Sequence, residues 1–302
     1  MAEPILRWAG GKRQFLNAIT SRLPPRDEYN NYFELFCGGG AVFFALEPSN
    51  GYINDINEPL VHFYRNFRDN PNLIIKQNKE LDDQLDNNNT IDEKKEFYYT
   101  RRREFNELHN GNCSDNLRQA SLFLFLNRTC FNGLYRTNSD GDFNVPMKKG
   151  PIYTTSIENK LRKGCSVLQN TTITSGDFLD VEENIGENDL VFLDPPYIKR
   201  ENPKQFDEYN PGGFGKERQK HVRDMALRLH KKGAYVMITN AYEAKKWYQG
   251  HEEFINNFDI KPIKGQRAIN SDSSQRGSLG STDIIVTNSP RFWTQKDFSS
   301  FR

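Results

Sequence analysis

Several residue patterns that would indicate a particular chemistry are missing from this chain of 302 residues. Its five histidines are scattered, and its cysteines form no CxxC pair. Neither residue type has the spacing of a metal site, so the sequence predicts no bound metal. It also favours reduced thiols over disulfides and argues against a redox enzyme. The cysteines are Cys37, Cys113, Cys130 and Cys165.

Long apolar runs and an excess of one charge are missing as well. No run approaches the roughly 20 residues that span a membrane. The N-terminus carries charge and glycine where a signal peptide needs an apolar stretch. The net charge is only +1, which by itself neither supports nor excludes a nucleic-acid partner. We therefore expect a cytoplasmic protein that contacts no membrane.

What the sequence does contain is an alternation of short apolar segments with helical ones. Strands are expected within residues 31–36, 51–57, 171–178, 189–197, 234–241, 258–263 and 283–288. Residues 58–126 are mainly helical in pattern, and the polar stretch 82–96 within them is predicted to be an exposed loop. Strands that alternate with helices predict an α/β fold with a mostly parallel sheet. The predicted domains are 1–57 with 165–302, and a helical insert at 58–164.

Two predicted strand ends carry residues suited to a nucleoside. The segment FELFCGGG, residues 33–40, places glycines between a strand and a helix, where a ligand can approach the backbone closely. Its spacing is not GxGxxG, so the pyrophosphate fingerprint is absent. Asp55 ends the next strand, where an acid can accept both ribose hydroxyls. A nucleoside-type ligand without phosphate, such as S-adenosylmethionine, fits this pattern.

The segment LVFLDPPY, residues 190–197, ends an apolar strand on an aspartate followed by two prolines. A tight turn with a capping aspartate is one interpretation. The other is chemistry on the exocyclic amine of a base, whose hydrogens Asp194 and the Pro195 carbonyl would accept. The rings of Pro195 and Pro196 fix the backbone, and such a rigid site is electrostatically preorganised. Tyr197 would supply a ring on which the base stacks.

These motifs and five more segments, in this order, resemble the Dam-type DNA adenine-N6 methyltransferase family. The further segments are RWAGGKR (7–13), NDIN (54–57), FNGLYRTNSDGDFNVP (131–146), GDF (176–178) and SSQRGSLGSTDIIVTN (273–288). The resemblance implies a class I S-adenosylmethionine-dependent methyltransferase, with a Rossmann-like sheet of seven strands. It also implies an inserted, mostly helical target-recognition domain that carries a β-hairpin.

The resemblance also implies roles for individual residues. The catalytic residues would be Asp194, Pro195, Pro196 and Tyr197. The cofactor-binding residues would be Trp8, Lys12, Phe36, Gly38, Gly40, Asp55, Asp177, Phe178 and Asp194. The DNA-binding residues would be Arg128, Asn132, Leu134, Arg136, Asn138, Pro146 and Arg276. Arg136 takes the family position that reads a guanine next to the target adenine, through its O6 and N7. The expected substrate is double-stranded DNA with a short palindrome that begins GAT, with GATC the first choice.

Several alternatives stay open at this point. A longer site such as GATATC is one, because relatives with that site carry a segment close to NRTCFNG, residues 127–133. A cytosine-N4 methyltransferase needs the same chemistry, although serine is then more common in place of Asp194. RNA and protein-glutamine methyltransferases fit the insert less well. The non-enzyme alternative is an inactive DNA-binding homologue. A cognate restriction endonuclease as a second partner is left open.

The distribution of charge agrees with a DNA partner. Residues 199–232 carry ten basic and five acidic side chains, and residues 118–149 carry five and two. These runs flank the DPPY motif and the hairpin, where DNA phosphates should lie. Residues 82–96 carry six acidic side chains and two lysines, so we expect them to face away from DNA.

Overall fold

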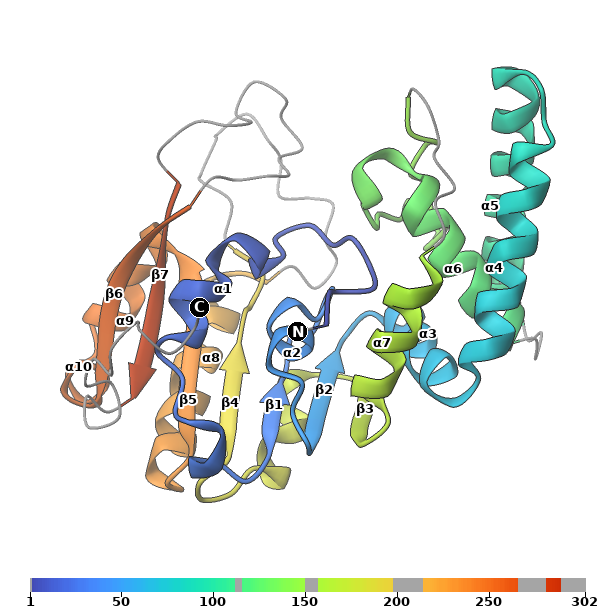
Figure 1. The fold of residues 1–302 in the computed structure, drawn as a ribbon. Helices are drawn as coiled ribbons and strands as arrows, with labels where there is room; N and C mark the ends of the chain where they lie inside the picture. Colours follow the sequence, from blue (N-terminus) through green and yellow to red (C-terminus); the bar gives the residue numbers. More distant parts are fainter. Residues whose placement is uncertain (1, 112–115, 150–156, 198–213, 266–280, 289–302) are drawn as a thin grey trace, which may run out of the picture. The chain divides into compact units, whose positions relative to one another are not determined.

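The structure, a computed structural model of the chain, describes residues 2–111, 116–149, 157–197, 214–265 and 281–288. Its strands form one seven-stranded sheet in the order β3-β2-β1-β4-β5-β7-β6 (Figure 1). Their bounds are β1 Tyr32–Glu34, β2 Gly51–Asp55, β3 Thr171–Ser175, β4 Leu190–Leu193, β5 Tyr235–Ala241, β6 Phe258–Gly265 and β7 Ser281–Asn288. The seven predicted strands are therefore confirmed.

Strand pairing is mostly parallel. β1 pairs with β4, β4 with β5, and β2 with β3 in the parallel sense. β7 runs antiparallel to both of its neighbours, β5 and β6. In the β2–β3 pair, Ile53 lies beside Ile173. This strand order, with one antiparallel strand near the edge, agrees with the predicted class I methyltransferase sheet.

β4 shows why these residues form a central strand. All four of its residues are buried. Strands of a parallel sheet are covered on both faces, so they consist of continuous apolar runs. The next residue, Asp194, is half-buried, and the strand ends there. The carboxyl ends of parallel strands are where open α/β sheets bind ligands.

The chain divides into two compact units, which are described separately. Unit 1 comprises the described residues within Met1–Arg13 and Cys37–Asp177. Unit 2 comprises those within Gln14–Phe36, Phe178–Ala268 and Gly277–Arg302. These bounds differ from the predicted insert at 58–164, because β2 and β3 group with the helices of unit 1. One reason is that Arg65 of α3 donates its Nε to the Ile173 carbonyl of β3 at 2.8 Å.

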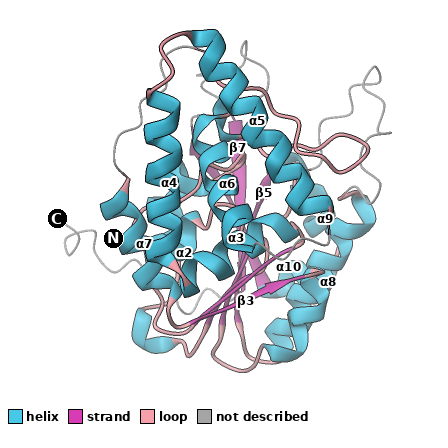
Figure 2. Ribbon diagram, turned by 90° about the vertical axis from the view of Figure 1, so that its right-hand side faces the viewer, coloured by secondary structure: helices cyan, strands magenta, loops and turns pink. Residues whose placement is uncertain are grey.

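Unit 1 is built around helix α6. Its helices are α2 Ala41–Leu46, α3 Glu58–Asp69, α4 Pro71–Asp86, α5 Ile91–Asn110, α6 Asn116–Thr129, η3 Phe131–Gly133 and α7 Glu158–Leu168. Every residue of α6 from Ala120 to Asn127 is buried, which is typical of a central helix. α4 and α5 both pack against it (Figure 2).

The polar stretch 82–96 is not one exposed loop, and that prediction was wrong. α4 continues to Asp86 and α5 begins at Ile91, so that only residues 87–90 link them. Thr90 and Glu93 form a capping box at the start of α5. The Thr90 hydroxyl accepts from the Glu93 amide at 3.2 Å, and the Glu93 carboxylate accepts from the Thr90 amide at 2.8 Å. The spacing T-x-x-E is a helix-start signal that the polar composition obscured.

Unit 2 holds the helices that follow its strands. They are α1 Leu16–Thr20, η2 Arg26–Glu28, η4 Phe178–Asn184, α8 Lys216–Lys231, η5 Tyr242–Ala244, α9 Lys245–Gln249 and α10 Glu252–Asn257, while η1 Lys12–Phe15 crosses the boundary between the units. α8 is amphipathic, with its apolar side chains buried. It ends at Lys231, and Gly233 follows the C-cap with a φ of 86° and an amide that donates to the His230 carbonyl at 2.9 Å. None of the described helices is both long enough and apolar enough to cross a membrane.

Candidate active site

In unit 1, the segments that follow β1, β2 and β3 are bonded together. Cys37 N–H donates to the Asn54 carbonyl at 2.9 Å, and Gly176 N–H donates to the Asp55 carbonyl at 3.3 Å. Asn54 Nδ2 in turn donates to the Gly176 carbonyl at 3.1 Å. Three segments predicted to bind the cofactor therefore meet at the carboxyl ends of their strands.

Asp55 is held by backbone donors on both carboxylate oxygens. Gly38 N–H donates to its Oδ2 at 2.8 Å, and Asn57 N–H donates to its Oδ1 at 3.0 Å. Burial raises the pKa of Asp55 above its ordinary value, although the backbone bonds from Asn57 and Gly38 act in the opposite direction. A carboxylate has about four acceptor positions. Ile56 supplies a third backbone bond, so at least one acceptor position is left for a hydroxyl of a ribose.

The glycine turn before α2 is closely covered by Trp8. Gly38 and Gly40 have φ of 48° and 64°, in the left-handed region that favours glycine. A Cβ at Gly38 would lie 2.6 Å from Trp8 Cδ1. Lys12 is buried, and its Nζ donates to the Gly10 carbonyl at 2.8 Å. The structure thus places Trp8, Gly38 and Asp55 in one set of contacts.

Ile56 is a candidate that the sequence reasoning missed. Its side chain is 74% exposed, although it directly follows Asp55 at the end of a buried strand. A single exposed apolar side chain is ordinary on a protein surface. Its place beside the proposed ribose acceptor is the informative point, because the base of a nucleoside needs an apolar surface next to the ribose site. The apolar residue between Asp55 and Asn57 in NDIN was the available signal.

In unit 2, the tetrad Asp194–Tyr197 follows β4, and neighbouring strands support two of its side chains. The Thr239 hydroxyl of β5 donates to Asp194 Oδ1 at 2.7 Å. The Tyr197 hydroxyl donates to Asp283 Oδ2 of β7 at 2.9 Å. Thr239 and Asp283 are themselves buried. The carboxylate and the aromatic ring are therefore anchored from the sheet.

A buried polar network supports the backbone of the tetrad. Gln219, in the first turn of α8, donates its Nε2 to the Pro196 carbonyl at 2.9 Å. Its Oε1 accepts from Asn240 Nδ2 at 2.8 Å, and that Nδ2 also donates to the Tyr248 hydroxyl at 3.0 Å. Each of the three side chains is 1% exposed. Burial raises the pKa of Tyr248, which keeps its hydroxyl neutral.

An aromatic group in unit 2 brings together two predicted cofactor residues. The rings of Phe36 and Phe178 lie 5.0 Å apart. Phe214 lies 5.5 Å from Phe36, edge to face, and 6.0 Å from Phe178. The guanidinium of Arg218 stands 4.7 Å from the centre of the Phe178 ring, a cation–π contact. Phe178 is buried while Phe36 and Phe214 are half-buried, so the group reaches the surface.

The predicted hairpin at 131–146 is present in unit 1. Its arms join through an isolated antiparallel bridge between Thr137 and Phe143. Asn144 N–H donates to the Arg136 carbonyl at 3.0 Å. The Arg136 Nε donates to Asn144 Oδ1 at 2.7 Å, so both the backbone and the side chain of Arg136 are tied to the opposite arm.

The first arm begins with a tight turn. Asn132 and Gly133 have φ of 57° and 65°, and Leu134 N–H donates to the Phe131 carbonyl at 3.2 Å. Two consecutive left-handed residues inside such a bond define a type I′ turn, for which Asn-Gly is the preferred pair. A Cβ at Gly133 would overlap the Cβ of Arg7. The glycine therefore also permits a close approach between the hairpin and the N-terminal segment.

The predicted DNA-binding residues differ in exposure. Arg136, Asn138 and Pro146 are exposed, Asn132, Leu134 and Arg128 are half-buried, and Arg276 lies outside the described residues. Asn138 Oδ1 accepts from the amides of Asp140 and Asp142, so this side chain stabilises the hairpin tip. Arg128 pairs with Asp82 at 2.9 Å, with 14% of each side chain exposed. The structure gives Arg128 an ion pair with Asp82, and a contact of Arg128 with DNA stays a prediction.

A metal site has no support in the described part of the chain. There, no group of three histidine, cysteine, aspartate or glutamate side chains is arranged to hold an ion. The described cysteines, Cys37, Cys130 and Cys165, are buried thiols. Burial raises the pKa of Cys130 to about 12, so it does not act as a thiolate nucleophile.

Comparison with known proteins assigns the chain to a family. The profile described as D12 class N6 adenine-specific DNA methyltransferase matches residues 8–269. The chain belongs to this family. It is an adenine-specific DNA methyltransferase that uses S-adenosylmethionine, and DNA is its substrate, as the sequence predicted. The family assignment decides against the cytosine-N4 alternative.

The D12 methyltransferase is similar to curated relatives over nearly its whole length. It is 35% identical over 290 residues to the type II methyltransferase M1.LlaDCHI of Lactococcus lactis subsp. cremoris, with 94% of this chain and 95% of the relative covered. It is 34% identical over 298 residues to M.MjaIII of Methanocaldococcus jannaschii, with 95% and 99% covered. It is 30% identical over 275 residues to the DNA adenine methylase of Escherichia coli (strain K12), with 90% of each covered.

Proposed function

We propose that this D12 methyltransferase methylates adenine in a short palindrome that begins GAT, with GATC the first choice, and that Asp194–Tyr197 is its catalytic tetrad. The observation that carries the proposal is the support of the tetrad from three elements. Thr239 bonds the carboxylate, Gln219 the backbone and Asp283 the tyrosine. A simple turn with a capping aspartate needs no such support, whereas a preorganised site does.

The tetrad would act on an adenine turned out of the duplex. Asp194 would accept one hydrogen of the N6 amine, and the carbonyl of Pro195 would accept the other. These two bonds draw the nitrogen lone pair out of conjugation with the ring, which makes the nitrogen a better nucleophile. Tyr197 would stack on the base, with its hydroxyl held by Asp283. When bound, S-adenosylmethionine supplies an electrophilic methyl group.

The residues present fit that cofactor. Asp55 has acceptor capacity for a ribose, and Ile56 beside it offers an apolar surface. Further residues proposed to hold the cofactor are Trp8, Lys12, Phe36, Gly38, Gly40, Asp177, Phe178 and Asp194.

Target recognition would lie in the hairpin. Arg136 is exposed on the first arm, and a guanidinium can donate to both O6 and N7 of guanine. Leu134 would contact a thymine methyl group, and Asn132 a base edge or phosphate. Arg128, Asn138, Pro146 and Arg276 complete the proposed DNA contacts. A longer GAT-containing site such as GATATC is the alternative target.

The same proposal assigns a role to each predicted domain. Residues 58–164 would read DNA, and residues 1–57 with 165–302 would bind the cofactor and carry out the transfer. Because its substrate is DNA, we place the enzyme inside the cell. Two relatives are named type II methyltransferases, which supports a cognate restriction endonuclease as a partner.

The proposal is tested in a host that lacks adenine methylation. Genomic DNA from cells that express the enzyme is digested with endonucleases that cut GATC only when it is methylated, or only when it is not. Sequencing that detects modified bases then reports the motif. We expect N6-methyladenine in GATC and none in cells that express Asp194→Ala. A methyl mark confined to another motif would overturn the target, and methylation by Asp194→Ala would overturn the mechanism.

A further inference from the structure

One buried carboxamide links the N-terminal segment to the hairpin within unit 1. Asn127, near the end of α6, is 5% exposed. Its Oδ1 accepts from Arg7 N–H at 2.9 Å, and its Nδ2 donates to the Arg7 carbonyl at 2.8 Å. The same Nδ2 also donates to the Gly133 carbonyl at 3.2 Å. Asn127 thus fixes both the backbone of Arg7 and the turn from which the first hairpin arm begins.

Trp8, the next residue, contacts both the hairpin and the glycine turn. Its ring stacks on Tyr135 with a centroid distance of 5.9 Å and an angle of 16° between the planes. Tyr135 lies between Leu134 and Arg136, the proposed base readers. The Trp8 ring also lies so close to Gly38 that no Cβ would fit at that position.

These contacts form a continuous series from the hairpin to the ribose acceptor. Arg136 follows Tyr135 in the chain, Tyr135 stacks on Trp8, and Trp8 covers Gly38. Gly38 N–H donates to Asp55 Oδ2 at 2.8 Å. All of these contacts lie within unit 1. They join the hairpin proposed to read DNA to the carboxylate proposed to bind the ribose of the cofactor.

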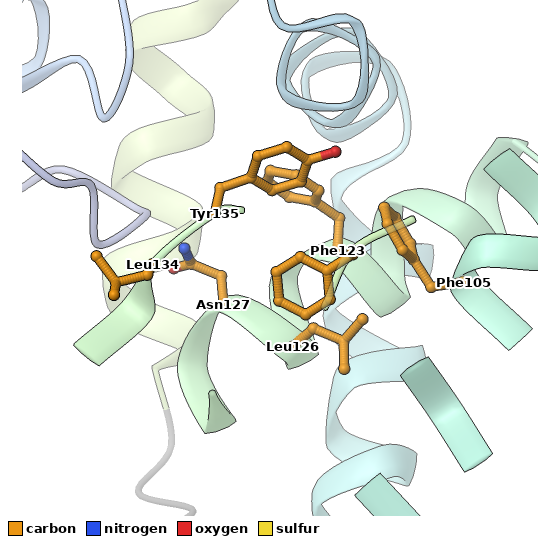
Figure 3. A pocket seen from close by; sticks show the side chains of 7 residues that line it. Phe105, Phe123, Leu126, Asn127, Leu134 and Tyr135 are labelled. Atoms are coloured by element: carbon orange, nitrogen blue, oxygen red, sulfur yellow. The ribbon is translucent and has the colours of Figure 1, made fainter. Parts of the chain in front are cut away.

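Tyr135 also lines a small cavity within unit 1. Tyr135, Leu134 and Asn127 border a small cavity together with side chains of α5, α6 and the second hairpin arm (Figure 3). The cavity volume is about 10 Å³, which is room for at most one water and for no ligand.

We propose that Asn127 and Tyr135 are positioning residues that couple recognition of the target sequence to binding of the cofactor. Through Arg7 and Trp8, a duplex that fixes the first hairpin arm also fixes the glycine turn and the amide that orients Asp55. The inference rests on the proposed roles of Arg136 and Asp55. Such coupling is reciprocal, so the cofactor strengthens binding of the correct duplex by the same factor.

The test measures the affinity for S-adenosylhomocysteine, an unreactive probe, with the full chain and calorimetry. The coupling factor is the dissociation constant without DNA divided by that with a saturating GATC duplex. For the wild type we expect a factor within about 5 to 150. In Asn127→Ala and Tyr135→Leu it should fall below about 2, while binding without DNA changes by less than about threefold. Tyr135→Phe keeps the ring and should keep the coupling.

Asn106→Ala is the matched control. Asn106 Oδ1 accepts from Phe143 N–H at 3.0 Å, and its Nδ2 donates to the Phe143 carbonyl at 3.2 Å. It therefore holds the second arm with the same pair of bonds, and the bonds described for it do not reach Arg7. This variant should weaken DNA binding but keep the coupling factor. Melting curves of all variants report their folding, and Tyr135→Leu carries the test if Asn127→Ala does not fold.

Three outcomes would overturn the inference. The coupling factor of the wild type could be one, or Asn127→Ala and Tyr135→Leu could keep the wild-type coupling factor. The third is a coupling factor that falls as far in Asn106→Ala as in those two variants. A wrong assignment of the target sequence would give a different result from a failure of the coupling. The wild type would then bind GATC no better than a duplex substituted at the first guanine. In that case the same factor is measured on the motif in which sequencing finds the methyl mark, so the coupling is still decided.

Discussion

Gln219 donates a hydrogen bond to the carbonyl of Pro196 at 2.9 Å, from a site where 1% of its side chain is exposed. The carbonyl belongs to the second proline of the tetrad, and the proposed catalytic carbonyl belongs to the first. A peptide unit is planar, and proline fixes φ. Restraint of the Pro196 carbonyl therefore restricts how the Pro195 carbonyl can point.

Gln219→Met, which keeps the length of the side chain but removes the bond, should lower kcat. Misplacement of a catalytic group by about 1 Å can cost on the order of 100-fold, so we expect a loss of roughly 10- to 100-fold with KM for DNA and cofactor nearly unchanged. Single-turnover methylation of a GATC duplex measures it. Gln169→Met is the control, because Gln169 donates a similar bond to the Arg68 carbonyl at the end of α7. Equal kcat values for the Gln219 variant and the wild type would contradict the positioning role.

Asp194→Ala and Tyr197→Ala should abolish methyl transfer while DNA affinity survives, because the proposed DNA contacts lie elsewhere. Tyr197→Phe separates the ring from its anchor. It keeps the stacking surface and loses the bond to Asp283, so we expect a loss of less than about tenfold, or about 1.4 kcal/mol of barrier. Turnover and duplex binding are measured on the same preparations. Turnover of either alanine variant within about tenfold of the wild type would rule out the tetrad mechanism.

Cofactor affinity should fall in acid because of Asp55. Burial raises the pKa of this carboxyl in the free protein. Ribose hydroxyls donate to the ionised form, so binding lowers that pKa and releases a proton. The affinity for the cofactor is then constant above the pKa of Asp55 in the free protein and falls as the pH drops through it. Because this pKa is raised, the fall begins at a pH above the ordinary aspartate pKa of about 3.9.

Calorimetric titration with S-adenosylhomocysteine from about pH 8 to about pH 5 measures this dependence, if the protein stays folded by circular dichroism. Asp55→Asn should bind more weakly than the wild type above the pKa of Asp55 and lose the dependence on pH. A wild-type affinity that rises or stays level as the pH falls would show that Asp55 does not accept the ribose in ionised form.

Arg136→Ala should relax discrimination at one base pair. If Arg136 contacts the guanine, the variant should lose about 1–3 kcal/mol of binding free energy for a GATC duplex. It should lose little for a duplex substituted at the first guanine. Loss of a phosphate contact instead weakens every sequence alike and makes the salt slope shallower by about one. Binding of both duplexes at two salt concentrations separates these cases. Unchanged discrimination at the first guanine means that another residue reads it.

The ion pair between Arg128 and Asp82 should contribute little net stability, although breaking it is costly. Burial raises the pKa of Asp82 despite the opposing effect of Arg128. Among the described residues, Arg128 Nη1 and Asp82 Oδ1 have no hydrogen-bond partner. Arg128→Met leaves a half-buried carboxylate unpaired, and we expect a loss of about 1–3 kcal/mol in the free energy of unfolding. Arg128→Met with Asp82→Leu should recover most of it.

Chemical denaturation measures these two variants. DNA binding by the double variant then decides the role of Arg128. An unchanged salt slope assigns Arg128 to structure, and a slope shallower by about one assigns it to a phosphate.

The strand ends could be predicted because the signal is local. The apolar run before Asp194, and the short strand pattern that closes on Asp55, indicate both the strands and the positions of the acids at their ends. The Asn-Gly pair at 132–133 is an equally local signal for a type I′ turn, although it was not used. The predicted loop at 82–96 failed for the opposite reason, since polar composition was weighed above the capping spacing of Thr90 and Glu93.

The supports of the site could not be predicted, because they join residues that are distant in sequence. Gln219 and Asn240 are 21 residues apart and lie on a helix and a strand. Each residue type is ordinary in such an element, and only the packing of α8 on β5 brings them together. The pairing of Arg128 with Asp82 is of the same kind, since nothing in NRT shows that a carboxylate on α4 faces the arginine.

The three bonds of Asn127 bear on how specificity can be transplanted between relatives. The segment that presents Arg136 is attached through α6 and through Arg7, which is 120 residues away from Asn127. A chimera that exchanges only the hairpin would bring new base-reading side chains onto a support shaped for another arm. The smallest exchangeable module is therefore discontinuous: the N-terminal pair Arg7 and Trp8, the end of α6, and the hairpin together.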